Sequence, residues 1–250
     1  TPANIHRHIR YARAGGFKLF MISCNQFAKT VGHFPWRDAY SNGLEDLQMI
    51  VQTVNDAGMI AGLHIYSTKA GKEDAYVTGT PDHRLNLRKM FTLAQPLTKS
   101  STTITIEEHP GRCTREEGRR ILKLGEELIT YQDYTTRRPF QFTGCRRGQF
   151  QTTAHPRKQG YKFGLLDVDT WPRFVRFDQQ TDIQQEVARR IGHIWKQAGF
   201  RFIYFDGAED VPQPYWFNVS YAQKLVYDQL QPPPIFAEAA FRSHFSWHIT

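Results

Sequence analysis

Residues 44–66 have the sequence LEDLQMIVQTVNDAGMIAGLHIY, and this stretch decides the fold class. Its first part places apolar residues at positions 44, 47, 50, 51 and 54, which is the spacing of one face of an amphipathic helix. Gly58 is a typical residue for ending such a helix, and the apolar run 59–66 predicts a buried strand. Another apolar run, at 17–22, precedes the helix. Strand, helix and strand in this order predict a unit of parallel α/β structure.

The same alternation returns in the last third of the chain. Apolar residues at 183, 187, 191 and 194 predict a helix that begins after Thr181 or Asp182 and stops at Gly199. A strand is predicted at 200–205, a helix at about 219–230, and further strands at 235–237 and 245–249.

The middle of the chain has a different pattern. The runs 102–106, 121–131 and 140–143 are rich in β-branched and aromatic residues and are separated by glycine and proline. They predict a small antiparallel β insertion. The expected organisation is therefore a first part of a (β/α) barrel at 1–92, a β-rich insertion at 93–164, and a continuation of the barrel at 165–250.

The predicted fold class is α/β, a (β/α)8 TIM-type barrel with a β insertion. A doubly wound sheet has the same rhythm, but neither G-x-G-x-x-G nor G-x-x-x-x-G-K-[ST] follows a strand here. Eight βα units of roughly 30 residues fill about 250 residues by themselves. Because the insertion occupies part of the 250 residues, we expect an incomplete barrel or a fragment of a longer enzyme.

Composition favours some partners over others. The 32 Lys and Arg against 24 Asp and Glu give a net charge of +8, which favours an acidic partner. Aromatic residues make up 14% of the chain and suit stacking on sugar rings or bases. No apolar run is long enough to span a bilayer. Three cysteines exclude a dense disulfide scaffold and leave either one Cys113–Cys145 bridge or three free thiols.

Carboxylates stand at the ends of two of the predicted strands. Asp206 ends the strand 200–205 and Glu238 ends the strand 235–237; they are 238 − 206 = 32 residues apart, about one βα unit. Successive strands are usually neighbours about 4.8 Å apart, so the two carboxylates are expected to approach ~5–5.5 Å, the separation of a retaining glycosidase. Glu209, three residues after Asp206, is the alternative acid.

Aromatic and basic residues in the loops after the predicted strands are expected to bind substrate. The candidates are Trp36, His64, Tyr215, Trp216, Arg242, His244, Trp247 and His248. The spacing of His, Cys, Asp and Glu matches no metal site, and the sequence gives no signal for a cofactor.

The segment from Gly199 to Gly207, followed by Phe236-Ala237-Glu238, resembles the middle strands of TIM-barrel glycoside hydrolases. It is most similar to the retaining α-galactosidase and α-glucosidase-like groups, and the resemblance implies that Asp206 is the nucleophile or base and Glu238 a candidate acid. The stretch from Gly62 to Asp82 looks like a segment of large, poorly characterised polysaccharide-degrading proteins. Gly207-Ala208-Glu209 departs from the α-galactosidase pattern, which leaves the second carboxylate open.

The sequence therefore predicts a glycoside hydrolase that cleaves a polysaccharide or oligosaccharide, with an anionic substrate favoured by the charge and Arg242 placed to meet it. The alternative is a non-catalytic carbohydrate-binding or structural barrel protein. A nucleic-acid binder is disfavoured because the insertion has no recognisable RNA-binding motif. Work on polysaccharides leads us to expect an extracellular or periplasmic location, and the oligomeric state is left open.

Overall fold

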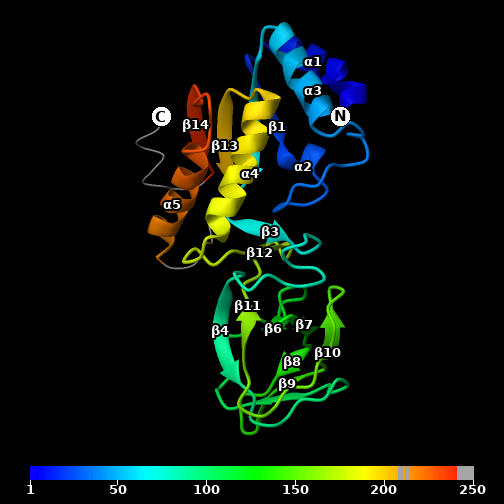
Figure 1. Ribbon diagram of the computed structural model, residues 1–250, viewed down its shortest axis with the longest axis vertical. Coiled ribbons are helices and arrows are strands. Elements are labelled where there is room, and N and C mark those ends of the chain that lie inside the picture. Colours follow the sequence, from blue (N-terminus) through cyan, green and yellow to red (C-terminus); the bar gives the residue numbers. More distant parts are fainter. Residues whose placement is uncertain (208–210, 212–213, 241–250) are drawn as a thin grey trace. The chain divides into compact units, whose positions relative to one another are not determined.

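The computed structural model describes residues 1–207, 211 and 214–240. The chain divides into two compact units (Figure 1). The first, called the α/β unit, comprises residues 1–69 and 179–250, and the second, called the β-rich unit, comprises residues 70–178.

A parallel sheet of four strands forms the centre of the α/β unit. Its order is β1-β2-β13-β14, with β1 at Leu19–Ser23, β2 at Ile60–Tyr66, β13 at Phe202–Asp206 and β14 at Phe236–Ala239. β2 and β13 are direct neighbours although the whole β-rich unit separates them in the chain. The β-rich unit is thus inserted between β2 and β13, which are neighbouring strands of the sheet.

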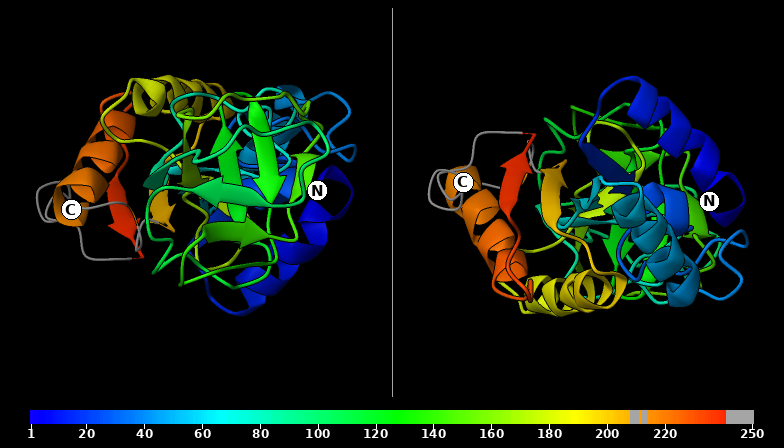
Figure 2. Two further views of the ribbon diagram at one scale, coloured as in Figure 1. Left: turned by 90° about the horizontal axis from the view of Figure 1, so that it is seen from below. Right: turned by 90° about the horizontal axis from the view of Figure 1, so that it is seen from above.

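Helices cover one face of this sheet. The helices in the described part of this unit are η1 (Pro2–Asn4), α1 (Ile5–Ala14), α2 (Cys24–Phe27), α3 (Leu44–Asp56), α4 (Ile183–Ala198) and α5 (Tyr215–Tyr227). α3, α4 and α5 lie along one side of the strands (Figure 2, right). The strand residues of that side are the buried ones, for example Leu63 and Ile203, each 0% exposed.

The predicted helix boundaries at 58 and 199 are confirmed for α3 and α4. Gly58, with φ +76°, lies just beyond α3, and Gly199, with φ +80°, caps α4. Asp182 precedes α4 as expected. α5 begins at Tyr215, four residues before the predicted start, because the apolar periodicity that marks its buried face begins only at Val219.

The α/β class is confirmed, and the described residues form an open sheet of four parallel strands with no closed barrel. The expected strand at 245–249 lies outside the described residues. Eight strands are needed to close a barrel of this type, so the four described strands do not form one.

The β-rich unit contains three sheets. A two-stranded sheet pairs β3 with β12, a five-stranded antiparallel sheet has the order β10-β7-β6-β11-β4, and a three-stranded one has the order β5-β9-β8. The bounds are β3 (Lys69–Gly71), β4 (Leu87–Thr92), β5 (Ile104–Ile106), β6 (Ile121–Leu124), β7 (Glu127–Thr130), β8 (Asp133–Tyr134), β9 (Phe140–Thr143), β10 (Arg146–Gln149), β11 (Lys162–Leu166) and β12 (Phe174–Arg176).

Aromatic side chains fill the core of the β-rich unit. Phe91 packs against Phe142 with ring centroids 5.1 Å apart and against Phe163 at 5.6 Å. Cys113 and Cys145 are buried in the same core as free thiols, and Cys24 of the α/β unit is also free, so the Cys113–Cys145 bridge does not form.

The boundaries of the β-rich unit lie outside the range 93–164. β4 pairs with β11, and Leu85 bridges to Phe177, so both flanks belong to the unit. These pairings join residues that are far apart in the sequence, and no composition change marks them.

Candidate active site

The register between β2 and β13 brings His64 and Asp206 to the same part of the sheet. Tyr204 is opposite His64, and Asp206 is opposite Tyr66. Side chains alternate between faces along a strand, so His64 and Tyr66 share a face with Tyr204 and Asp206. Tyr66 and Asp206 are the last residues of β2 and β13, at the edge that carries the chemistry in parallel barrels, and His64 and Tyr204 lie two residues before them.

Three groups contact the Asp206 carboxylate. His64 Nε2 lies 2.9 Å from Asp206 Oδ2, an ion pair when the imidazole is protonated and a hydrogen bond when it is neutral. The Gly207 backbone N–H donates to Oδ1 at 2.8 Å. The Tyr66 phenol also forms a side-chain hydrogen bond with Asp206. The side chain of Asp206 is 26% exposed, so it is held in place and still open to solvent.

Tyr66 is kept in its protonated form by its surroundings. Burial, and then the negative charge of Asp206, raise the pKa of the phenol well above its usual value. The Asn25 side chain contributes a hydrogen bond that acts in the opposite direction, and the Lys69 ammonium lies 5.8 Å from the ring centroid. Tyr66 therefore remains a hydrogen-bond donor to Asp206 at neutral pH.

Gly207 is the residue that allows this arrangement. Its φ is +70°, and a Cβ at this position would lie 2.6 Å from the Tyr66 ring and 2.9 Å from Lys69 Cε. Only glycine fits both the left-handed backbone and the close approach of the two side chains.

Cys24 lies beside the same cluster but does not act as a nucleophile. Its side chain is fully buried, and burial is the main cause that raises the pKa of its thiol to about 12. The charge of Asp206 adds to that shift. A reactive cysteine needs a thiolate near neutral pH. The candidate reactive group at this edge of the sheet is therefore the Asp206 carboxylate and not the Cys24 thiol.

Glu238 lies on the neighbouring strand, as predicted from the 32-residue separation. It is inside β14 rather than at its end, and its partner across the ladder is Tyr204. Asp206 is two residues further along β13. With ~4.8 Å between strands and ~3.3 Å per residue, the two Cα atoms are about 8 Å apart. The separation of ~5–5.5 Å expected from the sequence requires that the two carboxylates occupy directly paired positions on the neighbouring strands.

Other predicted residues lie elsewhere. Trp36 packs against Phe27 and Tyr40, with ring centroids at 5.6 and 6.3 Å, and is a part of the loop core between β1 and α3. Tyr215 and Trp216 form the start of α5 instead of a loop. Glu209, Arg242, His244, Trp247 and His248 are outside the described residues.

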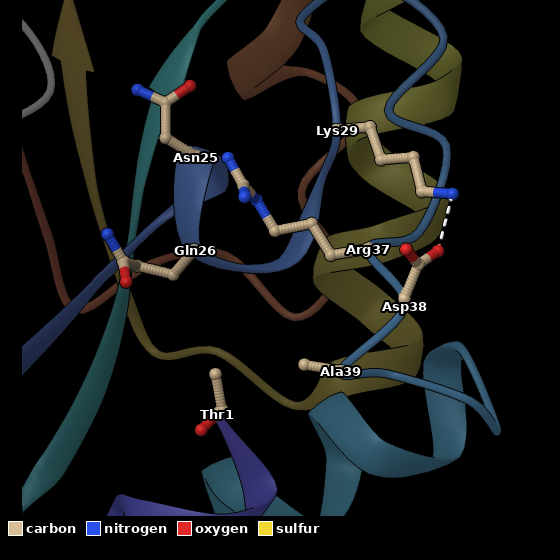
Figure 3. Close-up of a pocket in the computed structure, with 7 residues that line it drawn as sticks. All are labelled: Thr1, Asn25, Gln26, Lys29, Arg37, Asp38 and Ala39. Carbon is tan, nitrogen blue, oxygen red and sulfur yellow. Dashed lines mark ion pairs between the residues drawn. The ribbon is translucent and has the colours of Figure 1, made fainter.

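A pocket of about 600 Å³ opens beside α2, which directly follows β1. Figure 3 shows the side chains that line it: Asn25, Gln26, Lys29, Arg37 and Asp38, together with Thr1 and Ala39. Lys29 and Asp38 form an ion pair at 2.6 Å, and the Arg37 guanidinium points toward Asn25. The Asn25 side chain also forms a hydrogen bond with Tyr66. The pocket therefore adjoins the group of His64, Tyr66 and Asp206, which we call the Asp206 cluster.

Sequence reasoning did not select Asn25, Gln26 or Arg37. Asn25 and Gln26 come directly after the first strand, so the rule that strand ends carry the site would have found them. Arg37 carried no such signal, because it reaches the pocket through the fold of the loop before α3.

The described residues contain neither a cluster of metal ligands nor a membrane-spanning helix. No group of three or more His, Cys, Asp or Glu side chains among them is arranged to hold a metal ion. None of the helices in that part of the chain has the length and apolar character needed to cross a membrane.

No protein-family model and no curated protein matches the sequence. Solved structures do match. The GH36 α-galactosidase AgaA of Geobacillus stearothermophilus has a TM-score of 0.51 at 12% identity, over 98% of this chain and 26% of that chain. An α-galactosidase of Thermus thermophilus has a TM-score of 0.47 at 10% identity, over 93% and 35% of the two chains. A maltogenic α-amylase of Thermotoga neapolitana has a TM-score of 0.49 at 9% identity, over 99% and 43%.

Of these three, AgaA is the one with a TM-score above 0.5. The chain spans about a quarter of the length of that α-galactosidase, 26%. Identity at this level shows the fold alone. The likeness therefore shows that this chain shares its fold with part of a glycoside hydrolase.

Proposed function

We propose that the chain carries part of the active site of a glycoside hydrolase, with Asp206 as the carboxylate that attacks the anomeric carbon. The observation that carries the proposal is the position of Asp206: it ends a central parallel strand, and His64, Tyr66 and the Gly207 N–H hold it. The match to the α-galactosidase fold supports the same conclusion. The complete (β/α)8 barrel that such a site belongs to is part of this proposal.

In the proposed mechanism the Asp206 oxygen forms a bond to the anomeric carbon while the glycosidic C–O bond breaks. The leaving oxygen takes a proton from a carboxylic acid, for which Glu238 is the candidate on the adjacent strand and Glu209 the alternative. The resulting carboxylate then deprotonates a water molecule, which attacks the anomeric carbon and releases Asp206. His64 and Tyr66 act as positioning residues that orient the Asp206 oxygens.

The proposed substrate is an oligosaccharide or polysaccharide. Arg37 in the pocket beside Asn25, together with the net charge of +8, favours a sugar with an acidic group. Tyr204, whose ring lies 5.3 Å from the His64 ring, offers an aromatic side chain on the same face of the sheet.

The test is a turnover assay with a glycan panel that includes neutral, uronic and sulfated substrates. Asp206→Asn is expected to lower kcat by roughly a thousandfold or more, as removal of a nucleophile does in other hydrolases. Asp56→Asn, an exposed carboxylate at the end of α3, is the matched control and is expected to keep wild-type turnover.

Azide then distinguishes a nucleophile from an acid. With an activated aryl glycoside, azide is expected to restore turnover to Asp206→Ala by taking the place of the missing carboxylate, and to leave a glycosyl azide of inverted anomeric configuration. A glycosyl azide of retained configuration would mark Asp206 as the acid–base residue instead. Unchanged turnover in Asp206→Asn would contradict the assignment. Glycan binding by the wild type without turnover of any substrate would favour the carbohydrate-binding alternative instead.

A further inference from the structure

The β-rich unit has a pocket of its own, with a volume of about 380 Å³. We call it the Arg146 pocket. The residues that matter here are Lys72, Arg120, Gln132, Arg146, Gln149 and Phe150. All of them belong to the same compact unit, and none belongs to the Asp206 cluster.

Three neighbouring strands build one wall of the pocket. Thr130 on β7 pairs with Ile121 on β6 on one side and with Arg146 on β10 on the other, and all three residues line the cavity. The register between β10 and β7 shifts between Arg146 and Gln149, which marks a local irregularity of the ladder. Such irregularities re-aim side chains at the rim of a sheet.

Positive charge dominates the lining. Lys72, Arg120 and Arg146 face the single carboxylate of Glu117. The Arg120 Nη1 donates to the Gln132 carbonyl oxygen at 2.6 Å, and the Lys72 Nζ donates to the Gly118 carbonyl oxygen. These acceptors are neutral, and no ion pair joins any of the three cations to a described carboxylate. Arg120 and Lys72 are therefore positioned by neutral acceptors.

Partial burial in this position removes part of the hydration of the Lys72 ammonium group. Partial burial lowers the pKa of its ammonium group, and the more distant charge of Asp169 offsets part of that effect. A bound anion would add to the effect of Asp169 and favour the charged ammonium form.

The remaining lining suits a sugar. The amides of Gln132 and Gln149 and the hydroxyl of Thr130 are donors and acceptors for hydroxyl groups. Gln132 packs over Gly144, where a Cβ would lie 2.5 Å from its Oε1. Phe150 has a left-handed φ of +56°, its carbonyl oxygen accepts a hydrogen bond of 2.9 Å from the Gly79 N–H, and the residue lines the cavity.

We propose that the Arg146 pocket binds an acidic saccharide, with Arg120, Arg146 and Lys72 around its sulfate or carboxylate group and the two glutamine amides on its hydroxyls. This binding site is separate from the Asp206 chemistry and does not depend on it. It would hold a polysaccharide on the β-rich unit whether or not the chain hydrolyses it.

Isothermal titration on the full chain tests the proposal. The Asp206→Asn background prevents any turnover during the measurement. The probes are a heparin-derived tetrasaccharide, tetragalacturonate, maltotetraose, sodium sulfate and a short oligothymidylate. Binding of the heparin fragment alone identifies a sulfate ester, and binding of tetragalacturonate identifies a uronate. Neither outcome needs hydrolysis, so failure of the proposed function leaves this test intact.

Two variants and a matched control locate the site. Arg146→Gln and Arg120→Gln are expected to weaken binding of the acidic tetrasaccharide about tenfold or more, the usual effect of losing a charge-assisted hydrogen bond. Arg137→Gln removes the same charge from an exposed position outside the pocket and is expected to change Kd less than about twofold. Equal thermal midpoints of the variants show that the unit stays folded.

Four results would overturn the proposal. They are no binding of either acidic tetrasaccharide, equal affinity for maltotetraose, equal affinity for free sulfate, and affinity that Arg146→Gln and Arg120→Gln leave unchanged. Tighter binding of oligothymidylate that depends on the same arginines would also overturn it, because the pocket would then serve a nucleic acid.

Discussion

Asp206 depends on the residue that follows it. Gly207 supplies both the N–H that binds Oδ1 and the empty space into which Tyr66 and Lys69 fit. Both features come from a left-handed backbone that glycine adopts without strain. The Asp-Gly pair is therefore a structural unit of the site.

Gly207→Ala is expected to disturb the site through a steric clash. The left-handed φ costs about 1 kcal/mol, and the clash with the Tyr66 ring adds to it because the ring is tied to Asp206. Gly16→Ala is the matched control, since Gly16 has φ +72° and no atom within 4 Å of the added Cβ. Urea unfolding of the two variants measures the difference.

We expect Gly207→Ala to lose clearly more stability than Gly16→Ala and to lose turnover as well. Equal losses in the two variants would show that the space around Gly207 is not restricted. The description of the site as tightly packed against Tyr66 would then be wrong.

The buried thiols make stability depend on pH in the alkaline range. Burial raises the pKa of Cys24 and of Cys145 from 9.0 to about 12. The folded chain therefore holds these protons more tightly than the unfolded chain. The stabilising contribution is complete below about pH 9 and is lost as the pH rises toward 12.

Urea unfolding at pH 8 and at pH 10.5 measures this effect. The free energy of unfolding is expected to fall between the two values, and Cys24→Ala is expected to make the fall smaller. A fall of the same size in the variant would show that other groups, such as the buried tyrosines, carry it.

At the scale of the elements, one aromatic contact holds β2, β13 and β14 together. The Phe202 ring lies over Gly62 and stacks on Phe236 with centroids 4.8 Å apart and an angle of 12° between the rings. A Cβ on Gly62 would be 2.2 Å from the Phe202 ring. Glycine on one strand thus makes room for the large ring of the next.

Gly62→Ala is expected to destabilise the chain by about 1–3 kcal/mol, the usual effect of overpacking. Phe202→Leu in the same chain is expected to recover part of that loss, because the shorter side chain leaves room for the methyl group. A double-mutant cycle from urea unfolding measures the coupling. Additive effects would mean that the ring moves aside without cost.

At the scale of the whole molecule, the two units have separate cores. The β-rich unit has its own aromatic cluster around Phe91 and Phe142 and a buried ion pair between Arg147 and Glu127 at 2.6 Å. A unit with its own core is able to fold alone.

The isolated segment 70–178 is therefore expected to fold and to unfold cooperatively. Circular dichroism and urea unfolding measure this, and Glu127→Gln is expected to destabilise it by about 3–5 kcal/mol, because Arg147 is then buried without its partner. A segment with no cooperative transition would show that the β-rich unit needs the α/β unit in order to fold.

The sequence by itself determined the α/β class, the β-rich insertion and the position of Asp206 at a strand end, because each of these follows from local patterns of apolar residues and glycine. His64 and Asp206 illustrate the limit. Each was selected from its own strand, but their 2.9 Å contact depends on the pairing of β2 with β13 across 142 positions.

The tertiary structure alone decided the rest of the site. The register between β13 and β14 sets how far Glu238 lies from Asp206 along the strand direction. Hydrophobic periodicity does not specify this register when both faces of a strand are apolar. The Arg146 pocket likewise joins Lys72 to the strands β6, β7 and β10, the first of which begins at Ile121. Contacts of this kind depend on packing between distant segments, and the local sequence carries no record of them.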